Sequence, residues 1–219
     1  MRNPPTNNWM LFNHQPPNRI HRTIRRYAAE YYSEYGEDRW IHDNLPIPAR
    51  GVFVDVGAGD GVQGSNSLFF EQRGWTGLLV EPDPRQCMVL RATRKAPMAE
   101  CAIGSDDKRP FFLDASPCLS GFLRTGNNSI QVPTDSLTKV LREHRIDRID
   151  LLSIDTEGTE LEVWRTLDVP HYKPAIVIIE WLTFGIAKDP TNMQSAIEND
   201  GYRLVHRTPS NLILIRNDS

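Results

Sequence analysis

Short apolar stretches alternate with longer mixed segments along most of this chain. The apolar stretches are rich in Val, Ile, Leu and Phe and are bounded by turn-forming residues, which is typical of buried strands. The mixed segments between them are expected to be helices. The pattern predicts strands over 52–56, 77–81, 97–103, 149–154, 175–180, 202–207 and 211–216, and helices over 19–32, 65–73, 84–94, 135–144, 158–167 and 191–199.

This alternation of strand and helix predicts an α/β fold: a doubly wound, mostly parallel sheet with helices on both faces. The end of the chain departs from the alternation, because only the short turn Thr208–Asn211 joins the last two strands. Strands joined so tightly must be antiparallel. Residues 105–132 are rich in Ser, Pro, Gly and Asn and make a long connection, so we expect a small hairpin or a substrate lid there.

The length of 219 residues suits one domain, or one domain with an extension. Residues 1–30 differ in composition, since their prolines and asparagines predict a partly disordered segment and four arginines between residues 19 and 26 make it basic. These arginines favour the solvated face of a helix, or a contact with a phosphate-bearing or acidic partner. Residues 31–219 are expected to form the folded domain.

Charge and cysteine content narrow the class of protein. The net charge of −3 gives no overall basic footprint for nucleic acid. No stretch reaches the ~20 apolar residues of a membrane span. Cys87, Cys101 and Cys118 are odd in number and lack metal-ligand spacing, so we expect reduced thiols in a cytoplasmic protein.

The most informative segment is Val52–Gly61, an apolar strand that leads through an acidic residue into a glycine-rich turn. Glycine has no Cβ, so a ligand can come close to the backbone of this turn. A strand, a glycine turn and a helix in this order predict a binding site for a nucleotide cofactor. Gly59, Gly61 and Gly64 match the dinucleotide fingerprint, which suits NAD. Asp55 precedes the glycines and no basic side chain lies in the turn, which suits the ammonium group of S-adenosylmethionine instead.

The next predicted strand ends in Glu81, and Pro82 then turns the chain out of the sheet. Glu81 lies 22 residues beyond Gly59, which suits an acidic group that binds both hydroxyls of a cofactor ribose. NAD and S-adenosylmethionine both carry this ribose. Glu81 therefore predicts a nucleoside without choosing between the two cofactors.

A second acidic cluster follows the strand predicted over 149–154. Asp155 comes directly after it, Glu157 two residues later, and Glu160 opens a helix, where negative charge is favourable. In a doubly wound sheet this strand lies beside the first, so Asp155 is expected next to the glycine turn. These carboxylates, with Glu180 at the next strand end, would serve as a general base, orient an acceptor or bind a hard divalent ion.

Four segments of the chain resemble the FkbM family of S-adenosylmethionine-dependent methyltransferases. They are Tyr32–Asp38, Phe53–Gly61, Val80–Pro82 and Ile154–Glu160, the last being the most specific. One departure is Glu34, where the family commonly has Gln. The resemblance implies a seven-stranded sheet with its last strand antiparallel. It also implies methyl transfer to oxygen, often on a sugar or natural product, with some members methylating an amide nitrogen in a peptide.

The resemblance covers 31–219, so this part is expected to be the methyltransferase domain, with S-adenosylhomocysteine as the product. The expected acceptor is a small molecule, a sugar or a peptide; no membrane is expected, and an N-P-P-Y clamp for DNA bases is absent. An NAD-dependent oxidoreductase and a non-catalytic cofactor-binding module are the alternatives from other classes. The candidate catalytic residues are Asp155, Glu157 and Glu180, with Asp155 and Glu157 also the candidates for a metal ion. The candidate cofactor-binding residues are Asp55, Gly57, Ala58, Gly59, Gly61, Ser65, Glu81, Pro82, Ala102, Asp155, Glu37 and Asp38.

Overall fold

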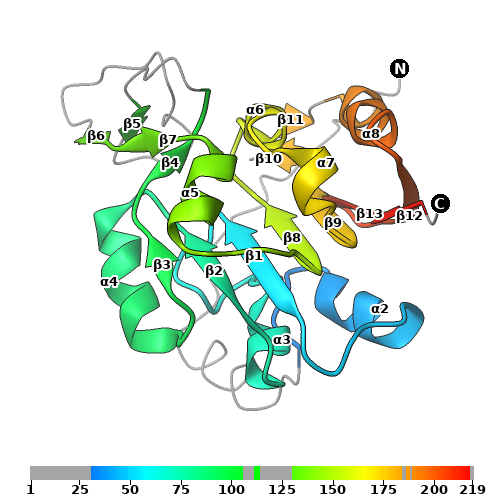
Figure 1. Ribbon diagram of the computed structural model, residues 1–219, viewed down its shortest axis with the longest axis horizontal. Coiled ribbons are helices and arrows are strands. Elements are labelled where there is room, and N and C mark those ends of the chain that lie inside the picture. The colour runs from blue at the N-terminus through cyan, green and yellow to red at the C-terminus, as the bar shows by residue number, and fades with distance from the viewer. Residues whose placement is uncertain (1–30, 106–110, 114–129, 184–185, 188, 218–219) are drawn as a thin grey trace, which may run out of the picture. The chain divides into compact units, whose positions relative to one another are not determined.

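A computed structural model describes residues 31–105, 111–113, 130–183, 186–187 and 189–217 (Figure 1). These residues belong to one compact unit, Tyr31–Ser219. The predicted basic extension and nearly all of the helix predicted over 19–32 lie outside the described residues, so both stay predictions.

A seven-stranded sheet forms the centre of this unit, in the order β12-β13-β9-β8-β1-β2-β3 (Figure 1). Its strands are β1 (Val52–Val56), β2 (Thr76–Val80), β3 (Met98–Ala99), β8 (Leu151–Ile154), β9 (Ile176–Glu180), β12 (Tyr202–Arg207) and β13 (Asn211–Arg216). Strands β3, β2, β1, β8 and β9 run parallel, and β13 is antiparallel to both of its neighbours. The predicted doubly wound, mostly parallel sheet with an antiparallel last strand is therefore confirmed.

Helices cover both faces of the sheet (Figure 1). They are α2 (Glu37–Asn44), α3 (Leu68–Gln72), α4 (Pro84–Thr93), α5 (Leu137–Glu143), α6 (Glu160–Arg165), α7 (Val169–Tyr172) and α8 (Pro190–Glu198). Successive strand residues point to opposite faces. Val54 and Leu152 share a core with α5, α6, α7 and α8, whereas Phe53 and Leu151 share a core with α2, α3 and α4. Burial on both faces explains why the strands are nearly continuous apolar runs.

The strand predicted over 97–103 is interrupted. Only β3 joins the main sheet, while β4 (Ala102–Ile103) turns away and pairs in parallel with β7 (Thr134–Asp135). The break places Cys101 and Ala102 at the wall of the cavity described below. An apolar run can thus be continuous in sequence and still serve two sheets.

Two helices differ from the sequence prediction. Helix α3 begins at Leu68 instead of residue 65, because residues 65–67 form a turn in which Oγ of Ser65 accepts the N–H of Ser67 and of Leu68, at 3.3 and 3.2 Å. Helix α2 is not predicted by the apolar pattern, since Ile41 is its one buried apolar residue and its other buried positions are acidic. Its position therefore depends on polar contacts, which a hydrophobic pattern does not report.

The long connection 105–132 contains an antiparallel pair, β5 (Phe111–Leu113) with β6 (Ile130–Val132). Most of the residues between these strands lie outside the described residues, so the substrate lid stays a prediction. A second short pair, β10 (Leu182–Thr183) with β11 (Ile186–Ala187), follows β9. Within the described ranges, no helix has the length and apolarity needed to cross a membrane. The cytoplasmic location expected from the cysteines stays a prediction.

Candidate active site

A cavity of about 370 Å³ lies at the carboxyl ends of β1, β2, β8 and β9. This volume is in the range of small-molecule sites, and the carboxyl edge is where open α/β sheets bind ligands. Most of the predicted site residues line it: Asp55, Gly57, Ala58, Gly59, Ser65, Glu81, Pro82, Ala102, Asp155, Glu157 and Glu180. Gly61, Glu37 and Asp38 do not line this cavity.

The glycine turn is fixed by backbone contacts. The N–H groups of Gly57 and Ala58 donate to the carbonyl oxygen of Val80, at 2.9 and 3.2 Å, which ties the turn to β2. Gly57 has a φ of 85°, and a Cβ built on it would lie 1.7 Å from the carbonyl oxygen of Asp155. A side chain at this position is therefore excluded by both conformation and space. The turn and the acidic loop after β8 meet here.

Gly61 has a packing role instead of a lining role. A Cβ on this residue would lie 2.3 Å from Cδ1 of Leu90 on α4 and 2.7 Å from Cγ of Arg94. Its carbonyl oxygen accepts a hydrogen bond from Nη1 of Arg94 at 3.0 Å. The absence of a side chain at Gly61 thus lets α4 pack closely against the glycine turn.

Glu81 is buried and held from two sides. The N–H of Gly59 donates to its Oε2 and the N–H of Asp83 donates to its Oε1, both at 2.8 Å. Burial raises the pKa of the Glu81 carboxyl, and the two N–H groups oppose this effect. Each carboxylate oxygen keeps a further lone pair, so the arrangement suits two hydroxyls of one ribose.

Asp55 lies near the end of β1, just before the glycine turn, and is also buried. The Oγ–H of Ser67 donates to its Oδ2 at 2.5 Å. Burial raises the pKa of the Asp55 carboxyl, and the guanidinium of Arg94 opposes that rise. A buried carboxylate of this kind suits a cationic ligand group such as an ammonium.

Two asparagines were not predicted from the sequence. Asn66 and Asn211 line the cavity and each is only 5% exposed. Within the part of the chain that the structure describes, neither Oδ1 has a hydrogen-bond partner. Buried acceptors are normally paired, so these two suit a ligand that carries N–H and O–H donors. S-Adenosylmethionine carries an ammonium, two ribose hydroxyls and an adenine amino group, and therefore fits this cavity chemically.

Glu37 and Asp38 hold the segment before α2 in place. Oε1 of Glu37 accepts from Oγ1 of Thr208 at 2.7 Å and from Nδ2 of Asn211 at 2.9 Å. Asp38 accepts from the backbone N–H of Tyr32 at 2.6 Å and from Oγ of Ser33 at 2.6 Å. Neither acid lines the cavity, and their predicted contact with the cofactor stays a prediction.

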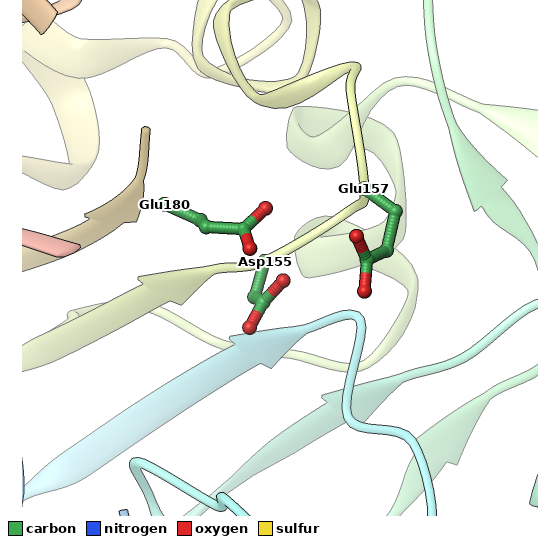
Figure 2. Close-up of side chains that lie close together, drawn as sticks. All are labelled: Asp155, Glu157 and Glu180. Carbon is green, nitrogen blue, oxygen red and sulfur yellow. The ribbon is translucent and has the colours of Figure 1, made fainter. Parts of the chain in front are cut away.

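Three carboxylates of the cavity lining lie close together (Figure 2). Asp155 follows β8, Glu157 lies in the loop before α6, and Glu180 ends β9; one oxygen of each lies within 4.8 Å of the others. Glu157 has a φ of 56°, a left-handed conformation that strains a residue with a Cβ. Glu160 supports this loop, since its Oε1 accepts the N–H of Thr156 and of Gly158 at 3.1 and 2.9 Å.

Close carboxylates interact strongly, because like charges favour uptake of a proton or a cation. The sequence predicted all three carboxylates at this rim, with Asp155 and Glu157 as the candidates for a metal ion. Glu180 comes from the neighbouring parallel strand, and the structure brings it within reach of the other two. Chemically, such a group accepts protons from a hydroxyl, orients a donor or coordinates a hard cation.

The family profile of the methyltransferase FkbM domain matches residues 55–204 of this chain. The match spans more than half of the sequence, and the chain belongs to this methyltransferase family. The prediction of an S-adenosylmethionine-dependent methyltransferase is thereby confirmed, and an NAD-dependent oxidoreductase is disfavoured.

Solved structures with a similar backbone have low sequence identity. A TehB-like S-adenosylmethionine-dependent methyltransferase from Corynebacterium glutamicum is 12% identical, with 90% of this chain and 96% of that chain covered at a TM-score of 0.46. A methyltransferase from Bacteroides fragilis in complex with S-adenosyl-L-homocysteine is 10% identical, with 89% and 82% covered at 0.45. A fibrillarin from Methanococcus jannaschii is 13% identical, with 80% and 70% covered at 0.48. No curated protein matches the chain.

Proposed function

We propose that this protein transfers a methyl group from S-adenosylmethionine to a hydroxyl oxygen of a sugar or natural product. The observation that carries the proposal is the group formed by Asp155, Glu157 and Glu180, whose carboxylate oxygens lie within 4.8 Å of one another beside the glycine turn. Carboxylates accept the proton of a hydroxyl readily, whereas an apolar wall would not.

The candidate cofactor-binding residues form two groups, one for the nucleoside of the cofactor and one for its amino-acid end. Glu81 would hold the ribose hydroxyls and Ala102 lies where the adenine would extend, while Asp55 would pair with the ammonium group. The bound cofactor supplies a methyl carbon made electrophilic by the positive sulfur. Because Gly57 contacts Asp155 through the backbone, the sulfur region and the acidic group would lie at the same place.

The protein's own contribution is orientation and proton transfer. Asp155, half-buried at the end of β8, would accept the acceptor's hydroxyl proton as oxygen attacks the methyl carbon. Glu157 and Glu180 would accept hydrogen bonds from neighbouring hydroxyls and hold the reacting oxygen in line with carbon and sulfur. In-line geometry of this kind supplies a large part of the rate enhancement in bimolecular transfers.

The second candidate reaction is methylation of an amide nitrogen in a peptide or protein. An amide is a weak nucleophile, so it needs stronger activation than a hydroxyl does. The same carboxylates would also hold a divalent cation, which would lower the pKa of an acceptor hydroxyl or polarise an amide carbonyl.

The test is methylation with S-adenosylmethionine that carries a carbon-13 methyl group. Panels of monosaccharides, glycosylated natural products and peptides serve as acceptors, and NMR assigns the new methyl to oxygen or nitrogen. We expect O-methyl products that require the native protein and that disappear in Asp155→Asn. Transfer only to amide nitrogen, or no transfer to any hydroxyl acceptor, would contradict the proposal.

A further inference from the structure

Arg94 is a buried arginine directly behind the cofactor turn. It follows α4 as its C-cap residue and is only 7% exposed. Its Nε pairs with the carboxylate of Glu71 on α3, and its Nη1 donates to the carbonyl oxygen of Gly61 at 3.0 Å and to Oγ of Ser65 at 3.2 Å. A buried guanidinium is rare unless it is paired, and Glu71 is the carboxylate that pairs with Arg94.

The remaining contact of Arg94 leads to the cofactor site. Its Nη2 donates to Oγ of Ser67 at 2.9 Å, and the same Oγ donates to Oδ2 of Asp55 at 2.5 Å. Arginine has donors and no acceptor, so the single hydroxyl proton of Ser67 must point toward Asp55. The three groups therefore form a directed chain of hydrogen bonds from the guanidinium to the carboxylate.

The charges around Asp55 show why this chain matters. Burial disfavours the carboxylate form of Asp55 and raises its pKa, and Glu71 adds to that effect, whereas Arg94 and the hydroxyl of Ser67 favour ionisation. An ionised partner is needed for pairing with an ammonium. The charged groups that border this region are Arg94 after α4, Glu71 on α3, Glu81 after β2 and Asp155 after β8.

We infer that Arg94 is a positioning residue for the amino-acid end of the cofactor: acting through Ser67, it keeps Asp55 ionised and oriented toward the cofactor ammonium. This inference rests on the proposed placement of S-adenosylmethionine in the cavity. It extends that placement to a residue outside the cavity lining, because Arg94 donates directly to the lining residue Ser65 and reaches the lining residue Asp55 through Ser67.

A purely structural role would give a different result. Arg94 also joins α3, α4 and the glycine turn, and its loss would loosen the whole cofactor site. Such loosening would weaken the binding of every part of the cofactor alike. In the inferred role, loss of Arg94 weakens only the binding of the end that carries the ammonium, and the size of this loss depends on pH.

The test compares two ligands by calorimetry. S-Adenosylhomocysteine carries the ammonium, and 5′-methylthioadenosine has the same adenosine without the amino-acid end. For Arg94→Gln we expect S-adenosylhomocysteine to bind about 10-fold or more weakly near neutral pH, the size of a lost charge-assisted contact, while 5′-methylthioadenosine changes by less than about twofold. Arg94 lowers the pKa of Asp55, so its loss should raise that pKa further, and affinity for S-adenosylhomocysteine should recover as the pH is raised.

Three further variants keep the test decisive. Arg94→Lys retains the charge and should restore much of the lost affinity. Ser67→Ala breaks the chain of hydrogen bonds from Arg94 to Asp55 and leaves the contacts of Arg94 with Glu71 and Gly61. It should therefore weaken S-adenosylhomocysteine and not 5′-methylthioadenosine, even if Arg94→Gln does not fold. Arg91→Gln is the matched control, since Arg91 lies on the same helix, is 54% exposed and pairs with Glu100 at the surface.

Equal weakening of both ligands at every pH, or unchanged selectivity in Ser67→Ala, would overturn the inference. If the unmodified protein bound neither ligand, the proposed cofactor site itself would be wrong. The two failures are therefore distinguishable.

Discussion

Gly57 and Asp155 meet backbone to backbone, with the carbonyl oxygen of Asp155 only 1.7 Å from where a Cβ of Gly57 would lie. The contact joins the turn after β1 to the loop after β8, two neighbouring parallel strands. It brings the glycine turn and the acidic group together through the backbone. The spacing between the glycine turn and the loop that carries Asp155 is therefore set by the pairing of β1 with β8.

The first prediction follows from this contact. Gly57→Ala should destabilise the protein by roughly 3 kcal/mol or more, because the new methyl needs both a left-handed conformation and a backbone shift. Urea unfolding measures the change. Gly74→Ala is the matched control, since Gly74 has a φ of 90° and an added Cβ would meet nothing within 4 Å. The control should lose only about 1–2 kcal/mol, and a similar loss in both variants would contradict the argument.

Local pattern predicted the sheet and the glycine turn well. The strands β1, β2, β8, β9 and β13 are mainly apolar runs bounded by turn residues, and β12 mixes apolar with basic residues before a short turn. Their existence therefore depends on short-range information that a sequence contains. The need for glycine at position 57 was also predictable, although the atom that excludes a side chain, the carbonyl oxygen of Asp155, depends on strand order.

The residues that the sequence did not reveal act through tertiary contacts. Arg94 follows an ordinary helix, and its role depends on the carboxylate of Glu71 and the hydroxyl of Ser67, which lie in another helix and its cap. Asn66 and Asn211 became candidates only because burial left their Oδ1 atoms without a partner among the described residues. Neither burial nor an unpaired acceptor is visible in a one-dimensional pattern.

Glu37 provides the second prediction. The sequence placed it at the cofactor, whereas the structure gives it three hydrogen bonds behind the cavity, from Thr208, Asn211 and the N–H of Tyr35. Glu37→Gln puts an amide N–H where an acceptor is needed and should cost about 1–3 kcal/mol of unfolding free energy. Affinity for S-adenosylhomocysteine should change by less than about twofold.

The control is Glu143→Gln, since Glu143 is 57% exposed and pairs with Lys139 only at 3.8 Å. It should change stability by less than about 0.5 kcal/mol, as surface pairs contribute little. A large loss of cofactor affinity in folded Glu37→Gln would return this residue to the binding site.

Glu81 provides the third prediction, which concerns pH. Glu81→Gln should weaken S-adenosylhomocysteine and 5′-methylthioadenosine alike, by about 10- to 100-fold, because both ligands carry the ribose. Burial raises the pKa of Glu81 and of Asp55, so both take up protons above the range of exposed carboxyls. Affinity for S-adenosylhomocysteine should therefore fall on acidification, and the fall should begin at a higher pH than exposed carboxyls would give.

Calorimetry between about pH 8 and pH 5 measures whether ligand affinity falls or rises on acidification. The fall should be steeper for S-adenosylhomocysteine than for 5′-methylthioadenosine, because only the former uses Asp55 as well. Asp55→Asn should remove that difference. Binding that strengthens on acidification would show that neither carboxylate acts in its ionised form.

Asp155 provides the last prediction. Asp155→Asn keeps the size of the side chain and should fold normally, but methyl transfer should slow by about 100-fold or more, the lower range for loss of a general base. Glu157→Gln should lose a similar amount of activity or less, because Glu157 is the more exposed of the two.

Removal of metal ions separates a general base from a metal ligand. If Asp155 is a general base, the activity of the native protein should persist in EDTA. If activity vanished in EDTA and returned with Mg²⁺, Mn²⁺ or Ca²⁺, the carboxylates would instead be ligands, and Asp155→Asn should then raise the metal concentration needed for half-maximal activity. Full activity of Asp155→Asn without added metal would exclude both roles for this residue and place the base elsewhere among the cavity acids.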